Sequence, residues 1–125
     1  MTPRRIPKPW GEEILFAHTG RYAGKVLRVR KGESLSLQYH ERKDEALYLF
    51  SGRIQVTLGA PGDAQGQDPV EHQHLDPGEA LHLPPGTRHR IEAIEDAILF
   101  EVSTPELDDV VRLEDRYGRE GTREP

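Results

Sequence analysis

The chain has 125 residues, and 17 Lys and Arg against 22 Asp and Glu give it a formal net charge of −5 at pH 7. This charge argues against nucleic-acid and anionic membrane partners, and the absence of cysteine excludes disulfides and thiolate metal sites. No apolar run reaches the length of a membrane span and residues 1–9 lack a signal-peptide pattern, so we expect a cytoplasmic protein.

The length fits one domain over residues 1–125, with an ordered core at about 10–117 and mobile, charged termini. Short alternations of apolar and polar residues, separated by Gly and Pro, predict the strands 25–30, 34–40, 45–50, 53–58, 70–75, 79–83, 88–94 and 97–102. Such a series is typical of an antiparallel sandwich or barrel. One helical turn is expected after Thr104, where Pro105 is followed by apolar residues at helical spacing.

Four polar side chains fall on strands that otherwise look like core. Gln38 and His40 are two residues apart and share one face of a strand, Glu45 begins the next strand, and His89 begins a later one. Two imidazoles, one carboxylate and one amide oxygen can surround a divalent cation and leave positions for water or substrate. The competing interpretation is that each histidine is an ordinary core or surface residue.

The spacing of these residues resembles that of the cupins. Gly32-x5-Gln38-x-His40-x4-Glu45-x6-Gly52 is similar to the first cupin motif, and Gly78-x5-Pro84-x-Gly86-x2-His89-x3-Ala93 is similar to the second. Gln38 and Ala93 depart from the usual His and Asn. The resemblance implies an all-β, antiparallel jelly-roll barrel, with one divalent ion (Zn, Mn, Ni or Fe) held by Gln38, His40, Glu45 and His89.

A narrower resemblance covers nearly the whole chain. Residues 8–11, 33–40, 85–92 and 101–119 are similar to the cupin domain of type II mannose-6-phosphate isomerases, which also have Gln at the position of Gln38. This resemblance implies a metal-dependent isomerase that interconverts the aldose and ketose forms of a sugar phosphate. The family has an Arg, implicated in catalysis, where this chain has Lys43.

Lys43 and His82 are the candidate catalytic residues. Lys43 lies in the loop between the ligand strands, where we expect its ammonium to reach substrate without touching the metal. His82 faces opposite to the flanking Leu81 and Leu83, and it either projects into the barrel near His89 or simply packs there. Two further functions stay open: a two-histidine, one-carboxylate oxygenase and a non-catalytic module that binds a sugar or another small molecule.

Other features have simpler interpretations. His72 and His74 lie two apart and suit either a second metal or, more plainly, an exposed strand. Trp10, the only tryptophan, is expected to pack the N-terminal segment on the barrel or on a partner. We expect a homodimer, because a small barrel of this kind leaves sheet edges and an apolar face uncovered.

Overall fold

The computed structural model describes residues 2–64, 66 and 69–121. These ranges hold β-strands and turns but no helix, and therefore no helix able to cross a membrane. The strands are β1 (Arg4–Lys8), β2 (Gly11–His18), β3 (Ala23–Val29), β4 (Leu37–Tyr39), β5 (Glu45–Ser51), β6 (Ile54–Leu58), β7 (Glu71–Leu75), β8 (Ala80–Leu83), β9 (His89–Ala93), β10 (Ala97–Ser103) and β11 (Val111–Glu114).

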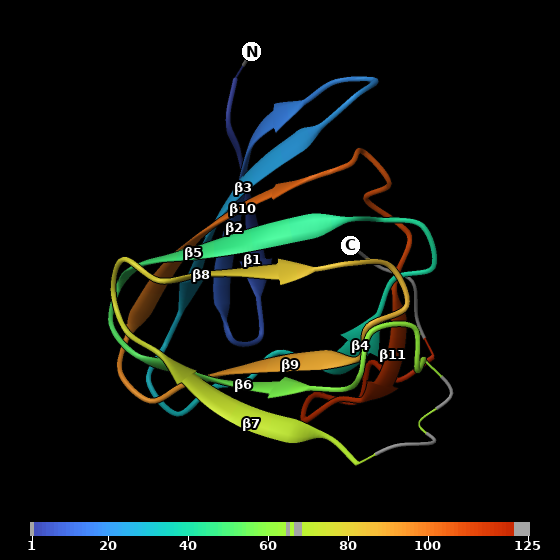
Figure 1. Cartoon of the computed structure of the whole chain (residues 1–125). Helices are drawn as coiled ribbons and strands as arrows, with labels where there is room; N and C mark the ends of the chain where they lie inside the picture. Colours follow the sequence, from blue (N-terminus) through green and yellow to red (C-terminus); the bar gives the residue numbers. More distant parts are fainter. Residues whose placement is uncertain (1, 65, 67–68, 122–125) are drawn as a thin grey trace.

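The strands form two antiparallel sheets that face each other (Figure 1). The six-stranded sheet has the order β1-β2-β3-β10-β5-β8, and the five-stranded sheet has the order β11-β4-β9-β6-β7. Several neighbours, such as β3 and β10 or β4 and β9, come from distant parts of the chain, which is the pattern of a jelly roll rather than of a simple meander. The predicted all-β, antiparallel jelly-roll fold is confirmed.

The core lies between the sheets. Strand alternation directs Leu47 and Leu49 of β5 and Leu99 of β10 inward, and each of the three is at most 2% exposed. Burying one such side chain contributes about 1.5–3 kcal/mol. The remaining members of the core cluster are Trp10, Leu27, Val29, Ile54, Val56, Leu75, Leu83, Ile91, Ala93 and Ala97.

Every predicted strand corresponds to an observed one, but the strands β1, β2 and β11 were not expected. β1 pairs with β2 along its whole length, within the segment predicted to be mobile. The last four residues of the opposite terminus, 122–125, lie outside the described residues. The expected helical turn after Thr104 is wrong: the chain turns there and continues as β11, which pairs with β4.

Candidate metal centre

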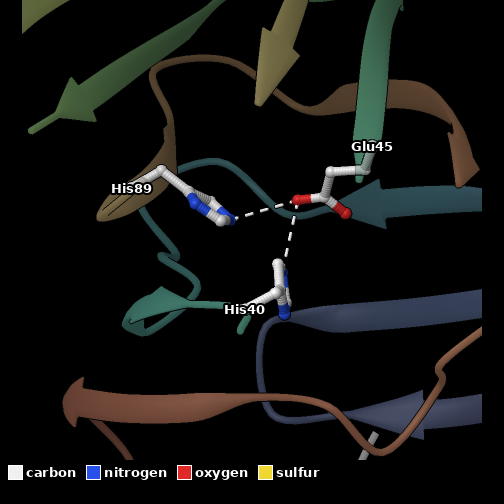
Figure 2. A group of neighbouring side chains, drawn as sticks. All are labelled: His40, Glu45 and His89. Atoms are coloured by element: carbon white, nitrogen blue, oxygen red, sulfur yellow. Dashed lines mark ion pairs between the residues drawn. The ribbon is translucent and has the colours of Figure 1, made fainter. Parts of the chain in front are cut away.

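Two histidines and one glutamate meet inside the barrel. His40 follows β4, Glu45 is the first residue of β5, and His89 is the first residue of β9. One oxygen of Glu45, Oε1, lies 3.4 Å from His40 Nε2 and 3.2 Å from His89 Nε2 (Figure 2). All three side chains are buried, so they form an enclosed group of nitrogen and oxygen donors.

The hydrogen bond on the far side of each ring defines its tautomer. His40 Nδ1 lies 2.5 Å from the backbone carbonyl of Asp109, and His89 Nδ1 lies 2.9 Å from that of Thr87. A carbonyl oxygen only accepts, so each Nδ1 carries a proton and donates it. In the neutral ring the Nε2 lone pair then points toward Glu45, and this is how outer hydrogen bonds orient histidine ligands in metal sites.

Electron-rich atoms that face one another repel unless a proton or a cation lies between them. His40 Nε2 is buried and has no hydrogen-bond partner among the described residues. Two donors that bind one ion at about 2.1 Å, at an angle of roughly 90–110°, lie about 3.0–3.4 Å apart. The observed distances to Glu45 Oε1, 3.4 and 3.2 Å, fall in this range. His40, Glu45 and His89 therefore fit a first-row divalent ion.

Gln38, the fourth predicted ligand, lies on β4 opposite His89. It lines a small internal cavity together with Glu45 and His89. Its Oε1 accepts a hydrogen bond of 2.6 Å from Ser36 Oγ. An amide oxygen has two lone pairs, so Gln38 keeps one acceptor position for an ion, and its role as a ligand stays a prediction.

Asp109 holds the loop that carries His40, and sequence reasoning missed it. Its carboxylate accepts the backbone N–H groups of Glu41, Arg42 and Lys43 at 3.0, 2.7 and 2.8 Å. Burial raises the pKa of Asp109, but these three donors outweigh burial and lower the pKa below its usual value. The bonded residues are 66 to 69 positions apart, so no local pattern identifies this role.

The turn before β9 supports the same loop from another side. The Gly86 N–H donates to the backbone carbonyl of His40 at 2.7 Å. Gly86 has a φ of 77°, a left-handed conformation that glycine adopts at little cost. The glycine of the second motif thus positions His40 as well as leading into His89.

Lys43 is buried beside the site rather than poised above it. Its Nζ lies 3.2 Å from Glu45 Oε2 and 3.1 Å from Glu101 Oε2. Lys43 therefore contacts a candidate ligand directly, and its predicted contact with substrate stays a prediction. Glu101, on β10, is a second residue that sequence reasoning missed, and it lines the cavities on both sides of the site.

The protonation states of Lys43, Glu45 and Glu101 depend on one another. Burial lowers the pKa of Lys43, but Glu101 and Glu45 outweigh it and raise that pKa. Burial raises the pKa of Glu45, yet the Lys43 ammonium outweighs burial and holds that pKa well below its usual range. For Glu101, burial and the Glu45 carboxylate raise the pKa against the opposing effect of Lys43. Glu45 thus keeps its negative charge more firmly, whereas Glu101 takes up a proton more readily.

The other histidines that the sequence singled out lie elsewhere. His82 faces outward from β8, with 64% of its side chain exposed, and pairs with Asp44 at 2.7 Å. His82 alternates with the flanking leucines, as predicted. The face opposite the leucines, however, is the outside of the sheet. His72 and His74 are exposed on β7, at the edge of the five-stranded sheet, as the plainer interpretation predicted.

Sequence comparisons place this geometry among known proteins. Residues 25–103 match the family profile described as cupin domain. The chain is 34% identical over 116 residues to the mannose-1-phosphate guanylyltransferase ManC of Salmonella typhimurium, covering 93% of this chain and 23% of that protein. It is 31% identical over 124 residues to the xanthan biosynthesis protein XanB of Xanthomonas campestris, covering 93% and 24%. The chain therefore spans about a quarter of the length of these relatives.

Solved structures give the same fold. KdgF from a Halomonas species superposes with a TM-score of 0.68 at 24% identity, covering 84% of this chain and 88% of that one. Oxalate decarboxylase from Bacillus subtilis, a protein with Mn(II) centres, superposes with a TM-score of 0.73 at 19% identity, covering 87% and 29%. At these identities the likeness shows the shared barrel.

Proposed function

Because this chain belongs to the cupin family, we propose that it holds one divalent metal ion through Gln38, His40, Glu45 and His89 and isomerises a sugar phosphate. The observation that carries the proposal is the convergence of two Nε2 atoms on one Glu45 oxygen, with both Nδ1 atoms engaged by backbone carbonyls. A bound divalent ion would polarise a substrate carbonyl and stabilise the negative charge of an enediolate.

Glu101 is the residue we assign to proton transfer. Isomerisation needs a group that removes a proton beside the carbonyl and returns it to the neighbouring carbon. Glu101 lines the cavity that also contains Gln38 and His40, and burial together with Glu45 raises its pKa toward the working range of a base. Lys43 holds Glu101 Oε2 in place at 3.1 Å and balances its charge. His82 is not part of this proposal, because it lies on the outer face.

The relatives support a sugar phosphate as substrate. Two of them are mannose-1-phosphate guanylyltransferases, and this chain aligns with about a quarter of their length. The resemblance to type II mannose-6-phosphate isomerases covers residues on both sides of the metal centre. The small, cation-lined cavity beside His40 supports a small anionic ligand rather than an extended polymer.

Two measurements test this proposal. After treatment with a chelator, calorimetric titration with Mn, Zn, Ni and Fe(II) should show one ion per chain, lost in His89→Ala and retained in His72→Ala, the exposed control. Because both imidazoles must be neutral to bind, affinity should fall between pH 7.5 and 5. In the interconversion of mannose and fructose 6-phosphates, Glu101→Gln should keep its metal and lose at least ~100-fold in turnover. Full metal binding by His89→Ala would refute the site.

An oxygenase is the second candidate, and the observation that favours it is the ligand set itself. His40, Glu45 and His89 alone form a two-histidine, one-carboxylate group of the kind that binds iron(II) and leaves positions for oxygen. Oxygen uptake with iron(II), in the absence of isomerase turnover, would favour this function. Metal binding with neither activity would leave the non-catalytic binding module.

We also propose that the chain forms a homodimer through the outer face of its six-stranded sheet. Five large apolar residues on this face are 37–59% exposed: Phe16, Tyr48, Phe50, Phe100 and Val102. At about 200 Å² for a fully exposed aromatic side chain, they present on the order of 450 Å². This matches the apolar share of the roughly 800 Å² that each partner buries in a standard interface.

A further inference from the structure

Arg88, the residue directly before His89, has a guanidinium that the protein encloses. It contacts the loop that follows β6, which the structure describes at residues 59–64 and 66. Arg88 Nε donates to the backbone carbonyl of Asp63 at 3.1 Å, and Arg88 Nη2 lies 3.6 Å from Asp63 Oδ2. The two side chains are only 11% and 12% exposed. Water and salt screen such a pair little, so Asp63 can hold Arg88 in place.

Two glycines let the loop close around this guanidinium. A Cβ added to Gly59 would lie 3.1 Å from Arg88 Nε, and one added to Gly66 would lie 3.4 Å from Arg88 Nη1. The Gly59 N–H also donates to the backbone carbonyl of Arg88 at 2.8 Å. This bond continues the pairing of β6 with β9, in which Leu58 lies opposite His89. The loop therefore holds both the backbone and the side chain of Arg88.

The same loop packs on the turn that supports the other histidine. A Cβ added to Gly86 would lie 3.5 Å from the Cα of Gly62. The Gly86 N–H in turn donates to the backbone carbonyl of His40 at 2.7 Å. The loop after β6 thus lies behind the turns that lead to both imidazoles.

The backbone on either side of Arg88 determines how the His89 ring points. His89 Nδ1 donates to the carbonyl of Thr87 at 2.9 Å, and this bond turns Nε2 toward Glu45 Oε1 at 3.2 Å. Arg88 is the residue between the donor and the acceptor of the first bond. A shift of Arg88 moves the Thr87 carbonyl and the His89 Cα together, and the ring follows them.

We propose that Arg88 and Asp63 are positioning residues of the metal centre. Asp63 acts through Arg88: it fixes the guanidinium, the guanidinium fixes the segment 87–89, and this segment presents Nε2 of His89 to the interior. Hydrogen bonds outside a ligand shell orient the ligands in the same way in metal sites. That His89 binds an ion rests on the proposed function, whereas the orientation of its ring does not.

Nuclear magnetic resonance of chelator-treated, ¹⁵N-labelled protein tests the orientation without a metal. In the wild type the ring nitrogens of His89 should show the tautomer with a proton on Nδ1, and this proton should exchange slowly with water. Arg88→Met and Asp63→Asn should keep the fold and speed that exchange at least ~10-fold and ~3-fold. Asp63→Asn has the smaller effect because its backbone carbonyl still accepts from Arg88 Nε. Asp76→Asn, in an exposed pair with Arg53 at 3.2 Å, is the matched control and should change nothing.

Calorimetric titration with Zn and Mn tests whether the two residues act in series. Arg88→Met should weaken ion binding ~10-fold and Asp63→Asn ~3-fold. In the double variant, Asp63→Asn should add nothing to Arg88→Met, because its route to His89 is already broken. A general loss of stability would instead add in the double variant and leave the His89 ring as it is. Arg88→Lys, which keeps the charge without the planar fork, takes the place of Arg88→Met if that variant does not fold.

Two results would overturn the assignment: unchanged exchange at His89 in both single variants, or an effect of Asp63→Asn that persists undiminished beside Arg88→Met. The outcome is separable from that of the proposed function. A wild type that binds no ion, with a His89 ring that depends on Asp63, refutes the metal centre and supports the positioning role. Ion binding that both single variants retain at wild-type affinity supports the metal centre and refutes the positioning role.

Discussion

Asp109→Asn should best distinguish the role of the loop that supports the candidate metal site from the role of the ligands themselves. Asp109 Oδ2 accepts the N–H groups of Arg42 and Lys43 at 2.7 and 2.8 Å, and Oδ1 accepts that of Glu41 at 3.0 Å. The backbone carbonyl of Asp109 remains available to His40 Nδ1 in the variant. The substitution therefore removes the anchor of the 41–43 loop and leaves every candidate ligand in the chain.

The cost follows from the bonds that an amide cannot make. In Asn one of the two terminal atoms becomes an NH₂ group, so one or two of the three accepted bonds are lost and the rest lose their charge. Hydrogen bonds to charged groups contribute about 1.5–3 kcal/mol each, and we expect a loss of about 2–4 kcal/mol in the free energy of unfolding. Because the loop also orients His40, metal affinity should fall roughly 10–100-fold.

The pH dependence has a definite sign. The folded pKa of Asp109 is lowered, so its contribution to stability is fully present above its unfolded pKa of about 4 and is lost as the pH falls through the folded pKa. Urea unfolding of the wild type and the variant should therefore differ most at pH 6–7 and converge below about pH 4. Asp108→Asn, exposed and next in sequence, is the matched control. Equal stability of both variants, or a difference that grows toward low pH, would refute this reasoning.

Two further predictions concern the charges near the ligands and the outer sheet face. Lys43→Met leaves two buried carboxylates without their cation and should cost about 3–5 kcal/mol in urea unfolding, and adding Glu101→Gln should recover part of that loss. A double variant no more stable than the single one would contradict this. Light scattering should give about twice the 14.2 kDa chain mass for the wild type and for the control Leu113→Asp, whereas Phe50→Asp should give one chain mass. A wild type of one chain mass would remove the dimer.

The strands around the site could be predicted from the sequence because apolar and polar residues alternate along them with a period of two. The missed elements lack that signal. β1 reads Arg-Arg-Ile-Pro-Lys, and a strand so charged and interrupted by proline is tolerated only at a sheet edge, where it lies here. β11 is four residues long, and Val111 also fits a helical spacing with Leu107 and Val110. Its pairing with β4, far away in sequence, decides in favour of a strand.

The candidate ligands could be predicted because they occupy short motifs, whereas the residues that support them could not. His40, Glu45 and His89 fall at fixed distances from turn glycines. Asp109 and Glu101 act across 58 to 69 residues of sequence, and only the folded sheets bring them to the loop. His82 shows a different limit of prediction from sequence. Alternation assigns a side chain to one of the two faces of a strand but does not say which face is inside.

The barrel interior has a polar end and an apolar end. Both arise from the same alternation of inward-facing and outward-facing residues along the strands. On β5 the inward side chains are Glu45, then Leu47 and Leu49, and on β9 they are His89, then Ile91 and Ala93. β10 runs antiparallel to β5 and shows the reverse order, Ala97 and Leu99 followed by Glu101. Antiparallel pairing therefore gathers the polar positions at one end, where each buried charge finds an opposite charge or a hydrogen bond within reach. The apolar end can supply the folding energy, and the polar end holds the candidate ligands and the charges that pair with them.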